Sequence, residues 1–586
     1  MRAVLSPYYL LLLAIKTVSA IPPPTNLPVV DLGYELHRAL THDNNTDTYK
    51  FSNIRYGQAP TGNLRFRAPV APLTNRDNIQ TGEEIRICPQ GLPKWQASAS
   101  KAIGLYSSGK DFSLDSWIAD IKDYVPSVGR PLPPTTEDCL FLDVHVPRKV
   151  FMAAQQGKSC DAAVLVWVGD SSLLGAGNTA NCEQIHGGGY ALGSKNGWPT
   201  PGFDPSGLLQ HAKDFEKNGI IFVALNYRLG ALGFLPGSDV EKDGHLNTGL
   251  LDQRLALNWV QENIHLFGGS RDRVTLMGQS AGGGSALLHM LGEKEGYKAP
   301  FAQIIAQSPA FIPTLQAPET AYSGFLQALN VTTLAEAREV SSEAIILANA
   351  HQIGNAPATS YIHGPVLDNN LIPDYPYTMF EKREFDKSVK VMTSHTSFEG
   401  ALFFDVENME DDDFVPWIQK SIPGLTMLEQ GYLANELYPP IFDGSLGYTN
   451  QGSRQMALWG EAVIDCNFVG ISKVMNGRGY AYRFNVTPGL HTQDLKYTFN
   501  DPQSPAFEPV AQDILQTVLT SFTMSGSPKL RNKYTMEFPP WGGQGDVISI
   551  NGQGVEKTLN VVNETRCAWW HNLHSRKAAR TSALQL

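Results

Sequence analysis

The chain has 586 residues, of which 42% are hydrophobic, 10% aromatic and 18% charged. This balance supplies enough apolar surface for a large core and excludes a mainly disordered protein. The formal net charge of −11 argues against the basic face that nucleic-acid binding requires, so we expect no nucleic acid among its partners. Beyond the N-terminal region there is no run of about 18 uninterrupted apolar residues, which predicts no transmembrane segment.

The N-terminus has the pattern of a secretory signal peptide. Arg2 precedes the apolar run Tyr8–Ile15, and Val18–Ala20 provides small residues for cleavage. A buried N-terminal helix is the alternative, which is disfavoured because Pro22–Pro24 follows at once. We therefore expect a signal peptide over residues 1–20, a single domain over residues 21–586 and secretion to the extracellular space.

An exported chain meets both glycosylating enzymes and oxidising conditions. Six cysteines in such a chain are expected to be at least partly disulfide-bonded, although their spacing alone does not pair them. Asn-x-Ser/Thr triplets are acceptors for N-glycosylation, but they also occur by chance. They lie at Asn44, Asn330, Asn485 and Asn563.

Short β-branched runs alternate with amphipathic stretches along the chain. This alternation predicts an α/β fold, with a large, mostly parallel sheet flanked by helices and with long loop insertions. One helix is expected over Leu251–Ile264, with Leu251, Leu255 and Trp259 on one face, and another directly after Ser280. The predicted strands are Ala163–Trp167, Ile220–Tyr227, Val274–Met277, Val389–Thr393 and Tyr480–Asn485.

The segment Gly278–Gly282 fits the pattern G-x-S-x-G, with Ser280 at its centre. A predicted strand precedes it and a glycine-rich helix start follows. A strand-to-helix turn of this kind holds a serine in a strained, exposed position where it can act as a nucleophile. The alternative is a plain glycine turn with a capping serine.

Several multi-residue blocks occur in one order around this motif. The blocks are Glu137–Leu140, Asn226–Gly230, Asn247–Gln253 and Phe267–Gly269. With these blocks the chain resembles the type-B carboxylesterases, a family that includes cholinesterases and many fungal secreted lipases, from about Phe51 to Trp570. The resemblance implies the α/β-hydrolase fold, a small-molecule or lipid ester as substrate and no cofactor, and it leaves the oligomeric state open.

A serine hydroxyl needs a histidine to take its proton and an acid to fix the tautomer of that histidine. In α/β-hydrolases the chain order is serine, acid, histidine. Glu399 and His491 follow Ser280 in that order, each in a loop just after a predicted strand. The resemblance therefore implies Ser280, Glu399 and His491 as the catalytic residues. A surface histidine is the alternative for His491.

The segment His186–Tyr190 resembles the oxyanion loop of the family. Backbone N–H groups of residues with small side chains can point at a developing negative oxygen. The resemblance implies Gly188, Gly189 and Ala281 as the donors.

A stretch of 17 residues, Val168–Gln184, separates the predicted strand from this loop. Related chains run from one to the other directly. Our hypothesis is that the stretch translates a retained intron, because valine codons begin with GT, glutamine codons can end in AG, and Ala180-Asn181 can be encoded like a branch point. The alternative is a genuine surface loop, since loops tolerate insertions.

The resemblance also implies disulfides between Cys88 and Cys139 and between Cys466 and Cys567. Cys160 and Cys182 then either bond to each other or leave Cys160 free. The loop between the first pair forms a lid in related lipases, and an ordinary packed loop is the alternative. Its large apolar residues are Trp95, Leu105, Tyr106, Phe112 and Trp117.

Other residues bear on substrate and function. Gln279 replaces the glutamate that precedes the serine in cholinesterases, which disfavours choline esters. Phe403 and Phe404 line an acyl pocket or belong to the core. The run Glu410–Asp413 is expected to be a solvated loop or helix start and not a metal site, because no suitably spaced His or Cys accompanies it.

The expected reaction is ester hydrolysis through an acyl-enzyme. A lipase with a lid over Cys88–Cys139 is one alternative, and amide hydrolysis by the same residues is another. A catalytically silent binding or adhesion protein on the same fold is disfavoured because all three catalytic positions are filled.

Overall fold

The computed structural model describes most of the chain from Leu27 to Leu584. The expected signal peptide, residues 170–184 of the 17-residue stretch, Cys182, Leu105 and Tyr106 lie outside the described residues. The described ranges are 27–96, 112–122, 135–169, 188–195, 204–292, 296–311, 318–368, 370–475, 477–500, 506–530, 536–541 and 546–584.

The centre of the fold is made of strands that are apolar on both faces. β7 (Ala162–Trp167) and β8 (Ile220–Leu225) are buried at every position and pair in parallel, with Ala163 opposite Ile220. Runs of this kind suit a sheet that is covered on both sides. Both predicted strands are confirmed, although β8 ends two residues earlier than expected.

These strands belong to a sheet of 11 strands, in the order β14-β13-β12-β11-β10-β9-β7-β8-β6-β4-β3. The strands from β8 to β13 are parallel, and antiparallel pairs stand at both ends. A smaller sheet has the order β1-β2-β5. The remaining bounds are β1 Val29–Asp31, β2 Glu35–Arg38, β3 Thr41–Asp43, β4 Thr48–Arg55, β5 Asn75–Gln80, β6 Phe141–Pro147, β9 Gly269–Gln279, β10 Gln303–Gln307, β11 Lys390–Thr396, β12 Tyr480–Phe484, β13 Asp546–Asn551 and β14 Gly554–Leu559.

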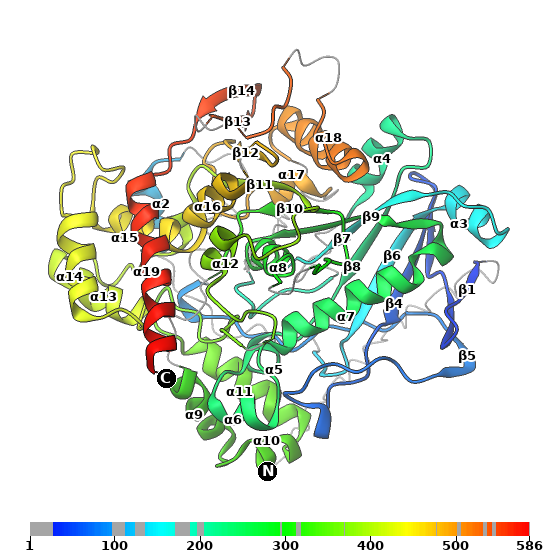
Figure 1. Cartoon of the computed structure of the whole chain (residues 1–586), viewed down its shortest axis with the longest axis horizontal. Helices are drawn as coiled ribbons and strands as arrows, with labels where there is room; N and C mark the ends of the chain where they lie inside the picture. Colours follow the sequence, from blue (N-terminus) through cyan, green and yellow to red (C-terminus); the bar gives the residue numbers. More distant parts are fainter. Residues whose placement is uncertain are drawn as a thin grey trace, which may run out of the picture.

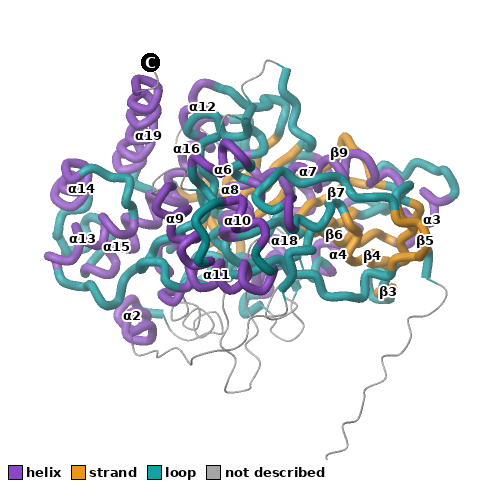
Figure 2. The backbone as a smooth tube through the Cα atoms, turned by 90° about the horizontal axis from the view of Figure 1, so that it is seen from below, coloured by secondary structure: helices purple, strands orange, loops and turns teal. Residues whose placement is uncertain are grey.

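Helices surround this sheet (Figure 1). In both views α2, α13, α14 and α15 lie together at the end of the molecule opposite to β4 (Figure 2). The helices are α2 Leu114–Lys122, α3 Arg148–Gln155, α4 Ser206–Phe215, α5 Gly230–Phe234, α6 Ser238–Asp243, α7 Thr248–Asn263, α8 Ala281–Leu288, α9 Pro318–Leu329, α10 Leu334–Glu339, α11 Ser342–Gly354, α12 Pro376–Lys382, α13 Phe414–Ser421, α14 Met427–Tyr432, α15 Gln451–Gly460, α16 Cys466–Met475, α17 Leu495–Thr498, α18 Pro509–Ser525 and α19 Glu564–Leu584.

Alternate residues of the central strands face two separate core clusters. In β7, Leu165 and Trp167 pack in a cluster with residues of α4 and α18, whereas Val164 and Val166 pack in a cluster with residues of α7 and α8. Because successive side chains of a strand point to opposite faces, helices cover the sheet on both sides. The predicted α/β architecture is confirmed.

The helix expected over Leu251–Ile264 is present as α7, and of the three residues expected on one face Trp259 is buried. Ala256, Leu257 and Val260 are fully buried, whereas Leu251 and Leu255 are half-buried. The buried face also carries the charged residue Asp252, whose carboxylate accepts hydrogen bonds from Nε and Nη2 of Arg228 at 2.8 and 2.7 Å. A pattern based on apolar residues alone misses a face that contains a buried ion pair.

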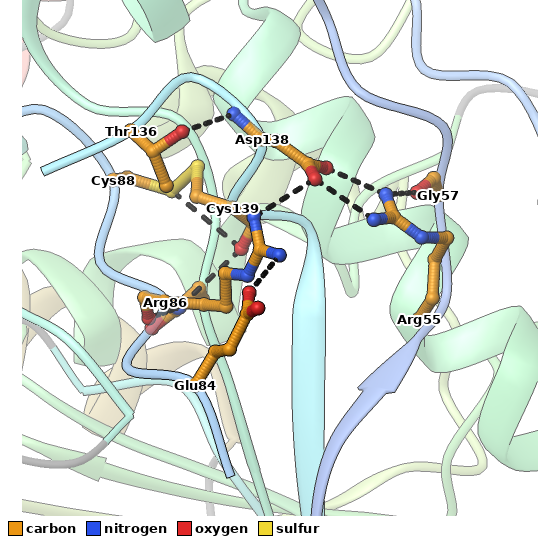
Figure 3. Close-up of polar contacts among 9 residues, drawn as sticks. Arg55, Gly57, Glu84, Arg86, Cys88, Thr136, Asp138 and Cys139 are labelled. Atoms are coloured by element: carbon orange, nitrogen blue, oxygen red, sulfur yellow. Dashed lines mark hydrogen bonds and ion pairs between the residues drawn. A yellow bond between two sulfur atoms is a disulfide. The ribbon is translucent and has the colours of Figure 1, made fainter. Parts of the chain in front are cut away.

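Both expected disulfides are present, and the first is surrounded by ion pairs. Cys88 bonds to Cys139, and Cys466 bonds to Cys567. Beside Cys139, the carboxylate of Asp138 binds Arg55 through Nη1 at 2.6 Å and Nη2 at 2.9 Å, and binds Nη1 of Arg86 at 3.0 Å (Figure 3). These contacts tie β4 to the two ends of the loop that the disulfide closes.

Cys160 carries a free thiol in the structure, with Sγ 3.7 Å from the carbonyl oxygen of Val150. Among the described helices, none combines the length and apolar character needed to cross a bilayer.

Candidate active site

Ser280 lies at the sharp turn between β9 and α8, as the G-x-S-x-G pattern predicts. Its backbone has φ 57° and ψ −123°, a combination that is unfavourable for a residue with a side chain. Two hydrogen bonds from the neighbouring strand end hold it: Ser280 N–H donates to the carbonyl of Gln307, and Ala310 N–H donates to the carbonyl of Ser280, both at 2.9 Å. The backbone of Gln307 and Ala310 therefore holds the turn in this conformation.

The glycines of the motif are required by close packing. A Cβ on Gly282 would overlap the carbonyl oxygen of Val168, and a Cβ on Gly278 would overlap the backbone of Gly282. The chain can thus turn tightly enough to present the Ser280 side chain at the carboxyl end of the sheet only because these positions carry no side chain.

His491 lies in the loop between β12 and α17, with 1% of its surface exposed. Its Nε2 is 2.9 Å from Oγ of Ser280, and its Nδ1 is 2.5 Å from Oε2 of Glu399. The side chain of Gln493 holds the loop, because its Oε1 accepts hydrogen bonds from the N–H groups of Gly489 and Leu490 at 2.9 Å. The structure brings the three predicted residues together.

Glu399 begins the short 3₁₀ helix η3 (Glu399–Leu402) just after β11. Its Oε1 accepts a hydrogen bond from Thr396 N–H at 2.5 Å. The next residue must be a glycine because a Cβ on Gly400 would overlap the carbonyl oxygen of Met456 in α15. Burial acts to raise the pKa of Glu399, but the adjacent His491 and these hydrogen bonds outweigh it and hold that pKa below its usual value. The carboxylate is therefore charged at neutral pH.

A second buried carboxyl group lies behind the site. Asp494 is fully buried, and its Oδ2 accepts a hydrogen bond from Nε2 of Gln307 at 3.0 Å. Burial, with the nearby charge of Glu399 in addition, raises the pKa of Asp494 to about 8. Because the two carboxyl groups differ in this way, Glu399 carries the charge and Asp494 stays neutral at pH 7.

A pocket adjoins Ser280. Gly189 and Ala281, two of the three predicted oxyanion donors, line it. Ala281 is the first residue of α8, where N–H groups have no acceptor within the helix. Gly189 has φ 45°, and a Cβ there would overlap the ring of Tyr361. Gly188, the third predicted donor, directly precedes Gly189, and its carbonyl oxygen accepts hydrogen bonds from the N–H groups of Ala191 and Leu192.

Aromatic side chains form much of the pocket wall. Phe403 lines the pocket and stacks on Trp459 with ring centroids 3.6 Å apart. Phe403 and Phe404 both belong to the hydrophobic core, and of the two only Phe403 is among the described residues that line this pocket. Trp459, Phe311 and Tyr361, which sequence reasoning missed, come from three distant segments, and nothing in their local sequence marks them.

The described parts of the Cys88–Cys139 loop pack close to this wall. The ring centroid of Trp95 is 5.5 Å from that of Tyr361 and 6.1 Å from that of Phe403. Trp117 is fully buried, and its Nε1 donates to the carbonyl of Ala401 at 2.9 Å. Trp95 therefore packs close to the pocket wall, and Trp117 is bonded to the residue two positions after Glu399.

The acidic run Glu410–Asp413 forms an exposed 3₁₀ turn (Asp411–Asp413) that leads into α13. Across the described ranges, no three or more His, Cys, Asp or Glu side chains are grouped so that they could hold a metal ion.

The fold and the site together define an α/β-hydrolase. A model of the family described as "Carboxylesterase family" matches residues 37–570. The chain is 34% identical over 575 residues to a carboxylesterase, patB, of Aspergillus clavatus, covering 96% of this chain and 99% of that protein. It is 27% identical over 447 residues to a secreted lipase of Arthroderma benhamiae, covering 75% and 80%. The crystal structure of Aspergillus niger EstA superposes with a TM-score of 0.72 at 23% identity, covering 93% of this chain and 98% of that one.

The chain belongs to the carboxylesterase family and is a carboxylic ester hydrolase.

Proposed function

We propose that the protein hydrolyses carboxylic esters with Ser280 as nucleophile, His491 as general base and acid, and Glu399 as the group that orients the histidine. The observation that carries this proposal is the continuous line of contacts from Oγ of Ser280 through His491 to Glu399, at 2.9 and 2.5 Å. Such a line activates a hydroxyl that is otherwise a weak nucleophile.

The reaction proceeds in two halves. Oγ of Ser280 attacks the ester carbonyl while Nε2 of His491 takes the hydroxyl proton. His491 then gives this proton to the leaving alcohol. Water, activated by the same histidine, releases the acid from the acyl-enzyme. The N–H groups of Gly188, Gly189 and Ala281 stabilise the negative oxygen of each tetrahedral intermediate, where one donor is worth about 3–4 kcal/mol.

The test is hydrolysis of p-nitrophenyl butyrate by the purified chain and by Ser280→Ala. Ser323→Ala is the matched control because Ser323 is an exposed serine on α9. We expect turnover by the parent and the control and at least a thousandfold loss in Ser280→Ala. Equal turnover in all three would refute the assignment of the nucleophile. A silent binding protein would show no turnover in any.

Gln279 is fully buried directly before the nucleophile. It places a neutral amide where cholinesterases carry a carboxylate, so we propose neutral esters as substrates. Aromatic residues of the Cys88–Cys139 loop lie near the pocket wall, which keeps lipase action as a second candidate. A profile of acyl lengths separates the two, because a lipase hydrolyses emulsified long-chain triglycerides and a simple esterase does not.

We propose that the protein is secreted and glycosylated. Asn44, Asn330 and Asn563 are exposed, as acceptors must be. Asn485 is the least suited of the predicted acceptors, because it is half-buried and its Oδ1 accepts a hydrogen bond from Oγ of Ser397 at 2.5 Å. Treatment of the secreted protein with an amidase that removes N-glycans, followed by peptide mass analysis, tests each site.

A further inference from the structure

The segment Gly188–Lys195 joins two of the proposed oxyanion donors, Gly188 and Gly189, to a buried lysine. Its backbone is left-handed at Gly189, with φ 45°, and again at Tyr190, with φ 61°. This conformation is unfavourable for a residue with a side chain as large as that of tyrosine, and it persists only where the surrounding structure holds it. The contacts that hold this segment therefore decide where the donor N–H groups point.

Two adjacent residues, Gln90 and Gly91, bind the middle of this segment. The N–H group of Gly91 donates to the carbonyl of Ala191 at 2.9 Å. The amide of Gln90 binds both backbone groups of Gly193, because its Oε1 accepts from the N–H group at 2.6 Å and its Nε2 donates to the carbonyl at 2.9 Å. These neutral hydrogen bonds fix the middle of the segment to the chain that follows Cys88.

A buried charge fixes the end of the segment. Nζ of Lys195 donates to Oδ1 of Asp143 at 2.6 Å, and the N–H group of Lys195 donates to Oδ1 of Asn226 at 2.8 Å. The side chain of Lys195 is fully buried, and that of Asp143 is 2% exposed. Asp143 lies on β6 and Asn226 directly follows β8, the strand that pairs with β6. Lys195 thus joins the segment to two neighbouring strands of the large sheet.

The carboxylate of Asp143 is charged. It also accepts a hydrogen bond from the N–H group of Asn53 at 2.8 Å, and its Oδ2 is 3.2 Å from Nζ of Lys50 on β4. Burial acts to raise the pKa of Asp143, but Lys195 and Lys50 outweigh it and hold that pKa well below its usual range. Because two charges lose their water when such a pair is buried, apolar residues of similar size often stabilise a fold as well. Stability alone therefore does not account for this pair.

We propose that Lys195 is a positioning residue, which holds the N–H groups of Gly188 and Gly189 in the oxyanion hole by anchoring their segment to Asp143. This inference rests on the proposed function. The sheet that carries Asp143 on β6 also carries β9, which ends directly before Ser280, so the ion pair sets the donors relative to the nucleophile. Their position matters because a misplacement of about 1 Å in an active site can cost about a hundredfold in rate.

Two substitutions separate the anchor from the charge. Lys195→Met removes the ammonium group and keeps an apolar side chain of similar length. Lys50→Met is the matched control, because it also takes a lysine away from the carboxylate of Asp143, but Lys50 lies on β4 and not on the segment. Melting temperatures show whether each variant is folded. If Lys195→Met is unfolded, the double variant Lys195→Met with Asp143→Asn replaces it, since no buried carboxylate is then left without its lysine.

The measurements are kcat/KM for p-nitrophenyl butyrate and the inhibition constants of two ketones, trifluoromethyl propyl ketone and methyl propyl ketone. Oγ of Ser280 adds to the carbonyl carbon of the fluorinated ketone, His491 takes the hydroxyl proton, and the carbonyl electron pair moves to the oxygen. The adduct therefore carries the negative oxygen of the tetrahedral intermediate. Methyl propyl ketone has the same chain but binds without forming this adduct, so it reports on the shape of the pocket alone.

We expect kcat/KM to fall at least tenfold in Lys195→Met, and the inhibition constant of the fluorinated ketone to rise by a similar factor. The inhibition constant of methyl propyl ketone, and all three quantities in Lys50→Met, should stay within about threefold of the parent values. A smaller fall in Lys195→Met, an equal fall in Lys50→Met, or equal weakening of both ketones overturns the role of Lys195 while Ser280-dependent hydrolysis still stands. Absence of Ser280-dependent turnover in the parent overturns the proposed function and this inference with it.

Discussion

Replacing Glu399 by glutamine tests the role of the acid through the tautomer of His491. Oε1 of Glu399 accepts from Thr396 N–H and Oε2 accepts from Nδ1 of His491, both at 2.5 Å. Glutamine has the same shape but only one acceptor oxygen. Bonding that oxygen to Thr396 turns the NH₂ group toward Nδ1, which must then accept.

The consequence is a histidine in the wrong tautomer. With Nδ1 unprotonated, the ring proton lies on Nε2, 2.9 Å from Oγ of Ser280, and His491 can no longer take the proton of the serine. The corresponding substitution in serine proteases lowers kcat about 10⁴-fold, which is about 5 kcal/mol of barrier at 1.36 kcal/mol per factor of ten. We expect a loss of that size in Glu399→Gln.

The assay is kcat/KM for p-nitrophenyl butyrate at pH 8, with urea unfolding to show that the variant is folded. Glu407→Gln is the matched control, because Glu407 is an exposed glutamate eight residues further on. We expect this control to equal the parent. If Glu399→Gln keeps more than a tenth of the parent activity while remaining folded, the reasoning about the tautomer is wrong.

We expect the free energy of unfolding, measured in urea, to be about 1 kcal/mol larger for Ser280→Gly than for Ser280→Ala, because glycine adopts the backbone angles φ 57° and ψ −123° without strain. Equal free energies of unfolding would show that the turn is unstrained. The pKa of Asp494 is raised to about 8 in the folded protein, so its contribution to the free energy of unfolding falls as the pH rises above the pKa of about 4 in the unfolded chain. From pH 5 to pH 8 the free energy of unfolding of Asp494→Asn should therefore increase relative to that of the parent. A difference that stays constant with pH would contradict the raised pKa. Deleting Val168–Gln184 lets Ile185 follow Trp167 directly, and we expect kcat/KM for p-nitrophenyl butyrate to rise; a transcript that retains the 17 codons as its dominant form would argue against the intron hypothesis.

Short sequence patterns predict those strands and turns whose structure depends only on neighbouring residues. The apolar runs of β7 and β8 are buried on both faces, and their prediction needs no knowledge of the rest of the chain. The turn at Ser280 is equally local, because its glycines and flanking elements adjoin in sequence. The apolar pattern of α7 does not include Asp252, which is buried and pairs with Arg228 from another segment.

The site itself joins residues that are far apart in the chain. The pairing of Ser280 with His491 spans 211 residues, and it was reached through resemblance to a family and not from spacing. Trp459 and His363 in the pocket wall carry no motif, so only the structure reveals them. The neutral carboxyl of Asp494 likewise depends on burial, which the sequence around it does not determine.

The most direct test of the central claim is covalent labelling with a fluorophosphonate, followed by mass spectrometry of the peptides. We expect one label per chain, attached to Oγ of Ser280, and loss of labelling in His491→Ala, because the reagent reacts with a serine that a histidine activates. A label on another serine, or labelling of Ser280 that persists without His491, would contradict the roles proposed for these two residues.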